Sequence, residues 1–447
     1  MDFKNIGVKI PKILLPNKNV DMTKWAVVAC DQYTSEPDYW KRVSELVADE
    51  PSTLKLVYPE VYLKDEDKEK RIQNINDSMS EYLEQELLEA QSNEVASAPK
   101  EKLLSEEEGI IYVERTINGK TRQGLVVALD LEYYDFSVDS KSLIRATEGT
   151  IVDRLPPRVE VRKNALIELP HIMVLIDDRE KKVIEPLTSL KSDLDKVYDF
   201  ELMMEGGHVK GYRLDLETSN NMLTELAKLA DPVVCKDKYG QEDVLLFAMG
   251  DGNHSLATAK TIWESTKSEK GMDHPSRFAL VELMNIHSEA MEFEPIHRVL
   301  FNVKKDFEIA LKEEFGETLE FKECSKEEMI TTVENSGDKQ IFGFINLNNY
   351  KLITFNKPTS NLTYGTLQKF LDKFVSLGNA EEIDYVHGTD VVCELGQKTG
   401  NCGFFLDSID KNSFFKSVIL EGALPRKTFS MGEANEKRFY VEARKIV

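Results

Sequence analysis

The stretch from Phe247 to Lys260, FAMGDGNHSLATAK, contains the residue types from which a phosphate-binding or proton-transferring site can be built. An apolar run, expected to be a strand, ends before Gly250, and Gly250 and Gly252 permit backbone angles and close approaches that other residues resist. Three polar residues then stand at the expected start of a helix: Asn253, His254 and Ser255. Free N–H groups and the helix dipole at such a start favour an anion such as phosphate.

Asp251 and His254 could supply the chemistry of this loop. Asp251 would oppose a bare phosphate, but it suits a bridging Mg²⁺ ion or a hydroxyl group that is to lose its proton. His254 could act as an acid, as a base or as a hydrogen-bond donor to phosphate. The residues leave a second interpretation equally open, an ordinary tight turn in which Asn253 or Ser255 caps the helix.

Four arginines fall within eighteen residues: Arg145, Arg154, Arg158 and Arg162. Arginine forks pair bidentately with phosphate or carboxylate, and the adjacent segment ATEGT adds the hydroxyl of Thr147. The alternation in RVEVR predicts a strand with Arg158 and Arg162 on one face, and Pro156-Pro157 is expected to exclude a helix. The group is therefore a candidate anion site. The alternative is ion pairing with the acids of the same segment: Glu148, Asp153 and Glu160.

Two more stretches could bring cations and hydroxyls to an anionic substrate. EFEPIHRV carries His297 and Arg298 before an expected strand, where both side chains could point into a cleft. LPRKTF carries Arg426 and Lys427 in the tail, which could close over the substrate. The alternatives are structural histidines, for His171 and His287 as well, and a docked C-terminal segment with a solvated basic face.

The pattern of apolar residues predicts an α+β protein. An amphipathic helix is expected within 65–108, and a hairpin at 110–131 turns at Asn118-Gly119. The remaining expected elements are buried strands at 25–30, 171–178 and 278–286, a helix at 219–230, a strand–turn–strand at 231–252 and an antiparallel pair at 339–347 and 350–356. Soft boundaries divide the chain into an N-terminal α+β segment (1–140), a catalytic core with the arginine group and the GDGNH loop (141–300), an α+β insertion (301–380) and a basic C-terminal segment packing on the core (381–447).

Composition narrows the classes of partner. The 447 residues carry 57 Lys+Arg against 79 Asp+Glu, a net charge of −22 that repels nucleic acid and anionic lipid. No apolar run approaches the length that spans a bilayer, and the first residues do not read as a signal peptide. Five scattered cysteines without a CxxC pair favour reduced thiols in a cytoplasm. Phosphate-loop, dinucleotide, hydrolase-elbow and protein-kinase motifs are absent, which disfavours those enzyme classes.

The segment VVCKDKYGQEDVLLFAMGDGNH with its following helix resembles the ParB/sulfiredoxin-like fold. Members of that superfamily carry an Asp-Gly-His-His-Arg type loop that, with its helix, binds nucleotide phosphates, and in free serine kinases it lies beside the reacting hydroxyl. Here Asn253 replaces the first histidine and Ser255 the arginine, so the resemblance implies that another arginine contacts the phosphate. Over nearly the full length the chain resembles the ParB-related family DUF 1015, through VVACDQYTSEPDYW, RLPPRVEVRKNALIELPHIMVLIDD, VELMNIHSEAMEFEPIHRV and the tail from Leu424.

The resemblance implies phosphoryl transfer to or from a small hydroxy amino acid, best serine or O-phosphoserine, as a kinase-like or a phosphatase activity. It implies Mg²⁺ and ATP or ADP as cofactors, with Asp251 and His254 at the reacting centre. Kinases of this type take a glutamate base from an N-terminal segment, which Glu36 or Asp31 could supply here. The alternatives are a ParB-like nucleotide-binding regulator without turnover and a small-molecule binding protein. Each of these functions is compatible with an oligomer.

Overall fold

The computed structural model describes residues 3–63, 67–84, 86–87, 101–347, 349–425 and 427–447, and its mixture of helices and sheets confirms the α+β class. Two compact units divide the chain. The first comprises Met1–Ala146, Thr150–Met291 and Glu433–Val447, and the second Thr147–Gly149 and Glu292–Gly432. In the part of the chain that is described, no helix is long and apolar enough to cross a membrane.

A ten-stranded mixed sheet forms the centre of the first unit, in the order β12-β13-β6-β7-β15-β11-β14-β9-β8 with β1 on β7. Its strands are β1 (Val8–Lys9), β6 (Ile111–Ile117), β7 (Lys120–Asp130), β8 (Tyr134–Asp135), β9 (Ile144–Arg145), β11 (Met173–Ile176), β12 (Asp195–Glu201), β13 (His208–Arg213), β14 (Phe247–Asp251) and β15 (Phe278–Asn285). Alternate residues enter two different cores. Val126 and Leu280 belong to one core, and Val127 and Val281 belong to the other, as the period of two along a strand requires.

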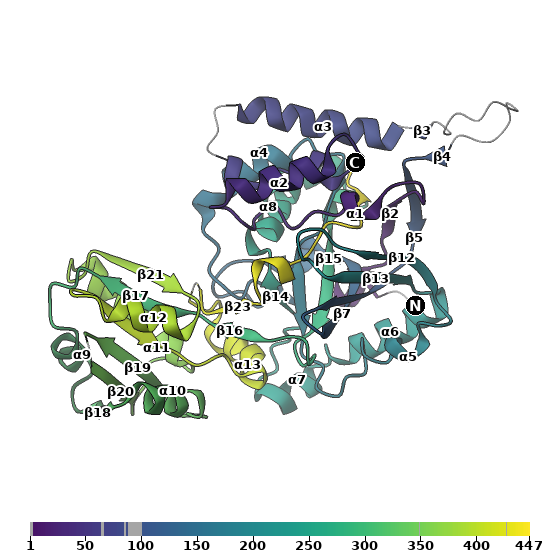
Figure 1. The fold of residues 1–447 in the computed structure, drawn as a ribbon. Helices are drawn as coiled ribbons and strands as arrows, with labels where there is room; N and C mark the ends of the chain where they lie inside the picture. The colour runs from purple at the N-terminus through teal and green to yellow at the C-terminus, as the bar shows by residue number, and fades with distance from the viewer. Residues whose placement is uncertain (1–2, 64–66, 85, 88–100, 348, 426) are drawn as a thin grey trace, which may run out of the picture. The chain divides into compact units, whose positions relative to one another are not determined.

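Helices cover both faces of this sheet, and Figure 1 shows α2 and α3 above the strands and α5 and α6 below them. The helices of the first unit are α1 (Met22–Trp25), α2 (Pro37–Val47), α3 (Lys68–Glu84), α4 (Leu155–Arg162), α5 (Leu187–Leu190), α6 (Leu216–Lys228), α7 (Pro232–Tyr239) and α8 (Asn253–Lys270). Short antiparallel pairs complete it: β2 (Lys12–Pro16) with β5 (Leu104–Glu108), β3 (Glu86–Leu87) with β4 (Glu101–Lys102), and β10 (Ile167–Glu168) with β24 (Arg444–Lys445).

The second unit has a six-stranded antiparallel sheet in the order β18-β20-β19-β22-β17-β21. Its strands are β17 (His297–Phe301), β18 (Leu319–Cys324), β19 (Ile341–Asn346), β20 (Asn349–Phe355), β21 (Glu382–Val386) and β22 (Cys402–Phe405), and β16 (Phe293–Pro295) pairs with β23 (Phe429–Met431). Its helices are α9 (Phe307–Phe315), α10 (Lys326–Glu334), α11 (Thr363–Ser376), α12 (Thr389–Gly396) and α13 (Lys411–Glu421).

Several expected elements are confirmed. The hairpin turns at Asn118 and Gly119, which both have positive φ, as a two-residue turn requires. Strands β11 and β15, helix α6 and the antiparallel pair of β19 and β20 are present where the apolar patterns predicted them. The expected helix after the GDGNH loop is α8, and its apolar face is buried.

Other expectations were wrong. RVEVR is the end of helix α4 rather than a strand, because Pro156 and Pro157 occupy its first turn, where a missing N–H costs nothing. The first half of 231–252 is helix α7, which Asp231 caps and left-handed Gly240 ends. Residues 25–29 of the run 25–30 are buried, but Trp25 ends α1 and the rest forms only an isolated bridge, from Val28 to Phe439. Of the charged stretch 65–108, the helix covers Lys68–Glu84, Leu104–Glu108 is a strand, and 88–100 lie outside the described residues.

Candidate functional site

The GDGNH loop joins β14 to α8 through Gly252, whose backbone conformation and surroundings favour glycine. Gly252 has φ +82°, and a Cβ atom there would lie 3.0 Å from the Cα of Ile172. Strand β14 lies between β11 and β9 in the sheet of the first unit. Asp251 is the last residue of β14 and lies opposite Met173 of β11. The expected cap by Asn253 or Ser255 is absent, because Gly252 itself is the cap and no side chain caps the helix. The N–H groups of the first turn therefore have no side-chain acceptor at the start of α8, and a ligand there could accept hydrogen bonds from them.

Two buried polar atoms in that first turn have no hydrogen-bond partner among the described residues: Asn253 Oδ1 and His254 Nε2. Burial, together with the nearby charges of Arg158 and Arg154, lowers the pKa of His254 to about 4, and Asp31 opposes this shift. The imidazole is therefore neutral at pH 7. A neutral imidazole beside two arginines and an uncapped helix start is a set of donors suited to an anion.

Asp251 is held as a carboxylate. Its Oδ2 lies 3.0 Å from Lys437 Nζ, and its Oδ1 accepts the N–H of Gly252 at 2.8 Å. Burial would raise the pKa of Asp251, but Lys437 and this N–H outweigh it and the pKa is lowered. The side chain keeps 27% of its exposure, so a substrate or a metal ion can still reach it.

His171 connects the loop to the N-terminal and C-terminal segments of the first unit. Its Nδ1 lies 2.8 Å from the hydroxyl of Tyr440, which accepts the backbone N–H of Cys30 at 3.1 Å. The Tyr440 hydroxyl can then donate to Nδ1, which places the proton of His171 on Nε2. That nitrogen lies 3.8 Å from Oδ2 of Asp31.

Arg158 comes to the site on α4, which packs against α8. Its guanidinium donates to the carboxylate of Glu60 at 2.5 Å and to the carbonyl of Arg154 at 2.7 Å. Burial raises the pKa of Glu60, and Arg158 opposes that rise. Among the described residues the cluster thus contains three carboxylates (Asp31, Glu60 and Asp251) and three cations (Arg154, Arg158 and Lys437).

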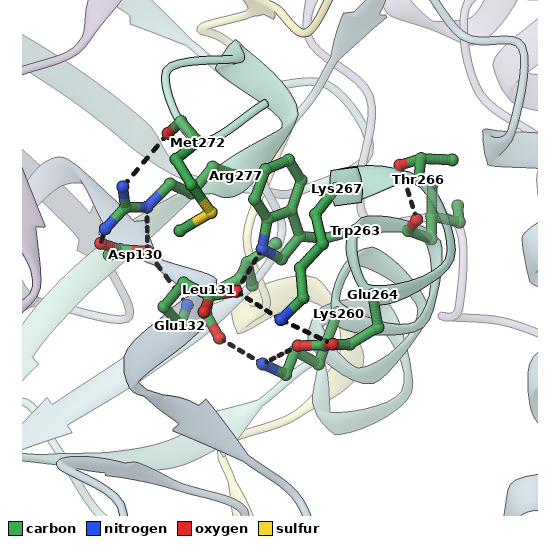
Figure 2. A network of polar contacts seen from close by, with 11 residues as sticks. Asp130, Leu131, Glu132, Lys260, Trp263, Glu264, Thr266, Lys267, Met272 and Arg277 are labelled. Carbon is green, nitrogen blue, oxygen red and sulfur yellow. Dashed lines mark hydrogen bonds and ion pairs between the residues drawn. The ribbon is translucent and has the colours of Figure 1, made fainter. Parts of the chain in front are cut away.

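A polar network holds the later turns of α8 against the end of β7 (Figure 2). Trp263 Nε1 donates to Glu132 at 2.6 Å, and Lys267 donates to the same carboxylate at 3.1 Å. Lys260 donates to the carbonyl of Leu131 at 2.8 Å and pairs with Glu264 at 2.6 Å. Because α8 is fixed along its length, its first turn presents His254 in a defined position.

The other predicted residues of the first unit have partners of their own. Arg145 is buried and donates to the carbonyls of Ser142 and Val244, at 2.8 and 3.1 Å. Arg162 pairs with Glu168 at 2.5 Å. Neither arginine pairs with the acids expected from the sequence. Glu36 is exposed at the position before α2 without a capping hydrogen bond, and its role as a base stays a prediction.

The remaining predicted residues belong to the second unit or lie outside the described residues. Thr147 is buried, Lys427 has φ +58°, and Arg426 is not described. His297 accepts the N–H of Leu406 at 3.2 Å, and burial lowers its pKa to about 3. Arg298 is fully buried. It donates to Gln368 at 3.1 Å, and its guanidinium carbon lies 4.9 Å from the ring centroid of Tyr364 and 5.3 Å from that of Tyr385. Their phosphate-binding roles stay predictions.

Of the basic tail, Arg438 and Arg444 are buried rather than solvated, whereas Lys427 is exposed and Arg426 lies outside the described residues. Arg438 pairs with Glu282 and Glu442, all three nearly inaccessible, and Arg444 pairs with Glu168 at 2.6 Å. Sequence patterns did not single out Glu60, Tyr440 or Lys437 individually as site residues. No spacing signal could have found them, because their partners lie far away along the chain.

The carboxylates and histidines do not form a metal cage. In the described part of the chain, no group of three or more His, Cys, Asp or Glu side chains could hold a metal ion. A Mg²⁺ ion that arrives with phosphates needs only one or two protein carboxylates. Asp251, ionised and partly exposed, fits that requirement.

Comparison with known proteins places the chain in a family. No curated protein matches it. Among solved structures, it is similar to a mutant free serine kinase in complex with AMP, at 12% identity and a TM-score of 0.40 over 72% of this chain and 92% of that one. The same kinase with ADP gives a TM-score of 0.39 at the same identity and coverage.

A conserved hypothetical protein from Pyrococcus furiosus is also similar, at 12% identity and a TM-score of 0.34 over 71% of this chain and 90% of that one. The family model described as a protein of unknown function, DUF1015, matches residues 14–374, most of the sequence. The chain therefore belongs to the DUF1015 family.

Proposed function

We propose that the chain is a phosphoryl-transfer enzyme that acts on a small hydroxy amino acid, with serine and O-phosphoserine as the preferred pair. The observation that carries the proposal is the first turn of α8, where Asn253 Oδ1 and His254 Nε2 are buried without a partner among the described residues and no side chain caps the helix. Buried polar atoms are costly when unpaired, so this turn is built to receive a ligand.

In this proposal the first turn of α8 and Arg158 bind the phosphoryl group. The N–H groups and His254 donate hydrogen bonds, and the arginine supplies the charge that Ser255 cannot. Arg158 replaces the family's loop arginine, although Glu60 already holds one side of its guanidinium. A guanidinium carries five N–H donors, so Arg158 can bind Glu60 and a phosphate together.

Asp251 accepts the proton of the attacking hydroxyl, and Lys437 keeps it ionised for that step. Mg²⁺ entering with ATP or ADP would neutralise phosphate charge, with Asp251 as its protein ligand. Asp31 and Glu36 remain candidates for the base, and Asp31 is the one beside His171.

Serine and adenine nucleotides come to the proposal from the family resemblance of the sequence. The TM-scores of 0.40 and below describe a distant likeness to the kinase structures, and the proposal does not rest on them. The ParB-like fold of the core is part of the same proposal.

Phosphorus NMR tests the function directly. The full chain is incubated with serine or O-phosphoserine, with and without ATP, ADP, pyrophosphate and Mg²⁺. A new phosphoserine signal with serine and a donor indicates a kinase, whereas release of phosphate from O-phosphoserine indicates a phosphatase. A double variant, D251N with H254A, should abolish the change, and Lys445→Met, in a partly exposed ion pair with Glu106, is the matched control. If no combination changes the spectrum, phosphoryl transfer is refuted.

A further inference from the structure

A second polar cluster lies in the first unit, at the other end of β11 from the GDGNH loop. Strands β11 and β15 run parallel, so their last residues meet at one edge of the sheet. Asp177 directly follows β11, and His287 lies two residues beyond the end of β15. Asp251 lies opposite Met173, the first residue of β11. At about 3.3 Å per residue, β11 separates the two places by about 13 Å, so the cluster is distinct from the anion site.

Asp177 orients the imidazole of His287. Its Oδ1 lies 2.6 Å from His287 Nε2, and its Oδ2 accepts the hydroxyl of Tyr239 at 2.5 Å. Burial would raise the pKa of Asp177, but these hydrogen bonds and the charges of Lys238 and Arg179 outweigh burial and lower it. An ionised carboxylate can only accept hydrogen bonds. In the neutral imidazole the proton is therefore on Nε2 and the lone pair is on Nδ1.

Nδ1 of His287 reaches the surface. It makes no hydrogen bond to a described residue, and it is not one of the buried atoms that lack a partner. The side chain keeps 13% of its exposure. The backbone N–H of His287 donates to Asn285 Oδ1 at 3.2 Å, and the same oxygen accepts the N–H of Asp178 at 3.3 Å. The fixed turn therefore presents one accessible nitrogen with a lone pair in a defined direction.

Two other histidines show what is particular to His287. Both ring nitrogens of His208 face carboxylates, with Asp199 at 2.6 Å and Glu201 at 2.7 Å, so neither nitrogen is available. His387 is exposed, and no carboxylate of the described residues pairs with it. His287 combines a carboxylate on one nitrogen with access to the other. A carboxylate placed in this way fixes the tautomer and stabilises positive charge on the ring.

The surroundings of Nδ1 favour attack by the imidazole itself. In the described part of the chain, no group of three or more His, Cys, Asp or Glu side chains could hold a metal ion, so Nδ1 has no partners for coordination. No hydroxyl of a described residue is hydrogen-bonded to Nδ1, so the chain places no nucleophile there for His287 to activate. Histidine can form covalent intermediates as a nucleophile.

Cations beside the imidazole favour an anionic electrophile. Arg179 Nε lies 3.4 Å from the Asp177 oxygen that contacts His287, and the arginine side chain is 39% exposed. Lys238 Nζ donates to the carbonyl of Asp177 at 2.6 Å. A phosphoryl group that bonds to Nδ1 would therefore lie close to a guanidinium, a favourable partner for phosphate oxygens.

We propose that His287 is a phosphoacceptor, at which Nδ1 takes the phosphoryl group of a small acyl phosphate. The Nδ1 lone pair forms the P–N bond, while the bond between phosphorus and the acyl oxygen breaks and its electron pair leaves with the carboxylate. The Nε2 proton stays on the ring, hydrogen-bonded to Asp177, and nothing is oxidised or reduced. The site is separate from the GDGNH loop, and the inference does not depend on the function proposed for that loop.

Acetyl phosphate is the probe that tests it. The full chain is incubated with acetyl phosphate, and labelled histidines are identified by mass spectrometry of peptides kept at alkaline pH, where the P–N bond survives. We expect His287 to be labelled at least tenfold faster than His387, and His208 to stay unlabelled. Asp177→Asn should slow labelling of His287 at least tenfold and leave His387 unchanged. Asp199→Asn, the same change at the carboxylate of His208, is the matched control and should not affect His287.

Tyr239→Phe, which removes one hydrogen bond to Asp177, is the second variant if Asp177→Asn does not fold, and it should also slow the labelling of His287. If His287 is labelled no faster than His387, or if the folded variant labels like the parent, the proposal is overturned. His287→Asn should abolish this labelling but leave the phosphorus NMR result with serine or O-phosphoserine as in the parent. Loss of both in a folded His287→Asn variant would overturn the separation of the two sites.

Discussion

Replacing His254 by glutamine tests whether the first turn of α8 keeps a neutral imidazole ready for an anion. The pKa of His254 is lowered from 6.5 to about 4, first by burial and then by the charges of Arg158 and Arg154. Glutamine keeps a polar side chain of similar reach but cannot titrate. Any part of the pH dependence of stability that comes from His254 should therefore disappear in H254Q.

The magnitude follows from proton linkage. As the pH falls below 6.5, the unfolded chain protonates His254 and the folded chain does not until about pH 4, so the folded state loses stability over this window. Between pH 7 and pH 5, the loss is about 1.5 pH units times 1.36 kcal/mol, or about 2 kcal/mol. H254Q should therefore gain about 2 kcal/mol relative to the parent over that interval.

Denaturant unfolding followed by tryptophan fluorescence measures the stability of the first unit, because all three tryptophans belong to it. His208 provides a control of opposite sign. Burial would lower its pKa, but Asp199 and Glu201 raise it overall, so its stabilising effect is present at low pH and lost as the pH rises. H208Q should lose stability relative to the parent between pH 7 and pH 5.

Carbon-13 NMR of labelled histidines gives the direct readout, and the signal missing in H254Q identifies His254. Saturating tripolyphosphate should move its titration upwards, because a bound anion stabilises the imidazolium. A His254 signal that titrates near 6.5 in the free protein, or that ignores tripolyphosphate, would refute the reasoning.

Three further predictions concern residues of the first unit. Gly252→Ala places a side chain on a residue with left-handed backbone and should lower the free energy of unfolding by about 1–3 kcal/mol. An unchanged midpoint of denaturant unfolding would contradict this strain. Arg438→Met leaves buried carboxylates without their cation and should cost about 3–5 kcal/mol, whereas Lys445→Met, 42% exposed, should stay within about 1 kcal/mol; equal effects would refute this. Lys437→Met removes the cation that keeps the pKa of Asp251 low, so the acid limb of kcat/KM should move to higher pH, and an unshifted limb would exclude Asp251 as the ionised group.

The strands around the site could be predicted from the sequence because each is a continuous apolar run ended by polar residues. β11, β14 and β15 are buried on both faces, and such strands need no alternation. Helix α4 could not be predicted in this way. The five residues RVEVR are too few to distinguish the alternation of a strand from about one and a half turns of helix. In a sequence, prolines in the first turn of a helix also cannot be distinguished from prolines that prevent a helix.

The GDGNH loop could be predicted as a candidate because its residues are adjacent in the chain. Its surroundings could not, because they are assembled from distant segments: Tyr440 reaches His171 over 269 residues and Arg158 reaches Glu60 over 98. Proximity in sequence also misled in one case. Arg145 lies near the other arginines in the chain, but it is buried and donates to the backbone carbonyls of Ser142 and Val244.

The charge of the chain bears on how an anion reaches the loop. The protein carries −22, and Arg438 and Arg444 of the basic tail pair with buried carboxylates, so these two cations do not offset this field at the surface. Within the cluster the three carboxylates balance the three cations. Net attraction for a phosphate must therefore come from the uncapped start of α8 and from Arg158 at short range, against long-range repulsion. Under the proposed function, a nucleotide that arrives with Mg²⁺ would meet less of this repulsion than a free nucleotide, because it carries less negative charge.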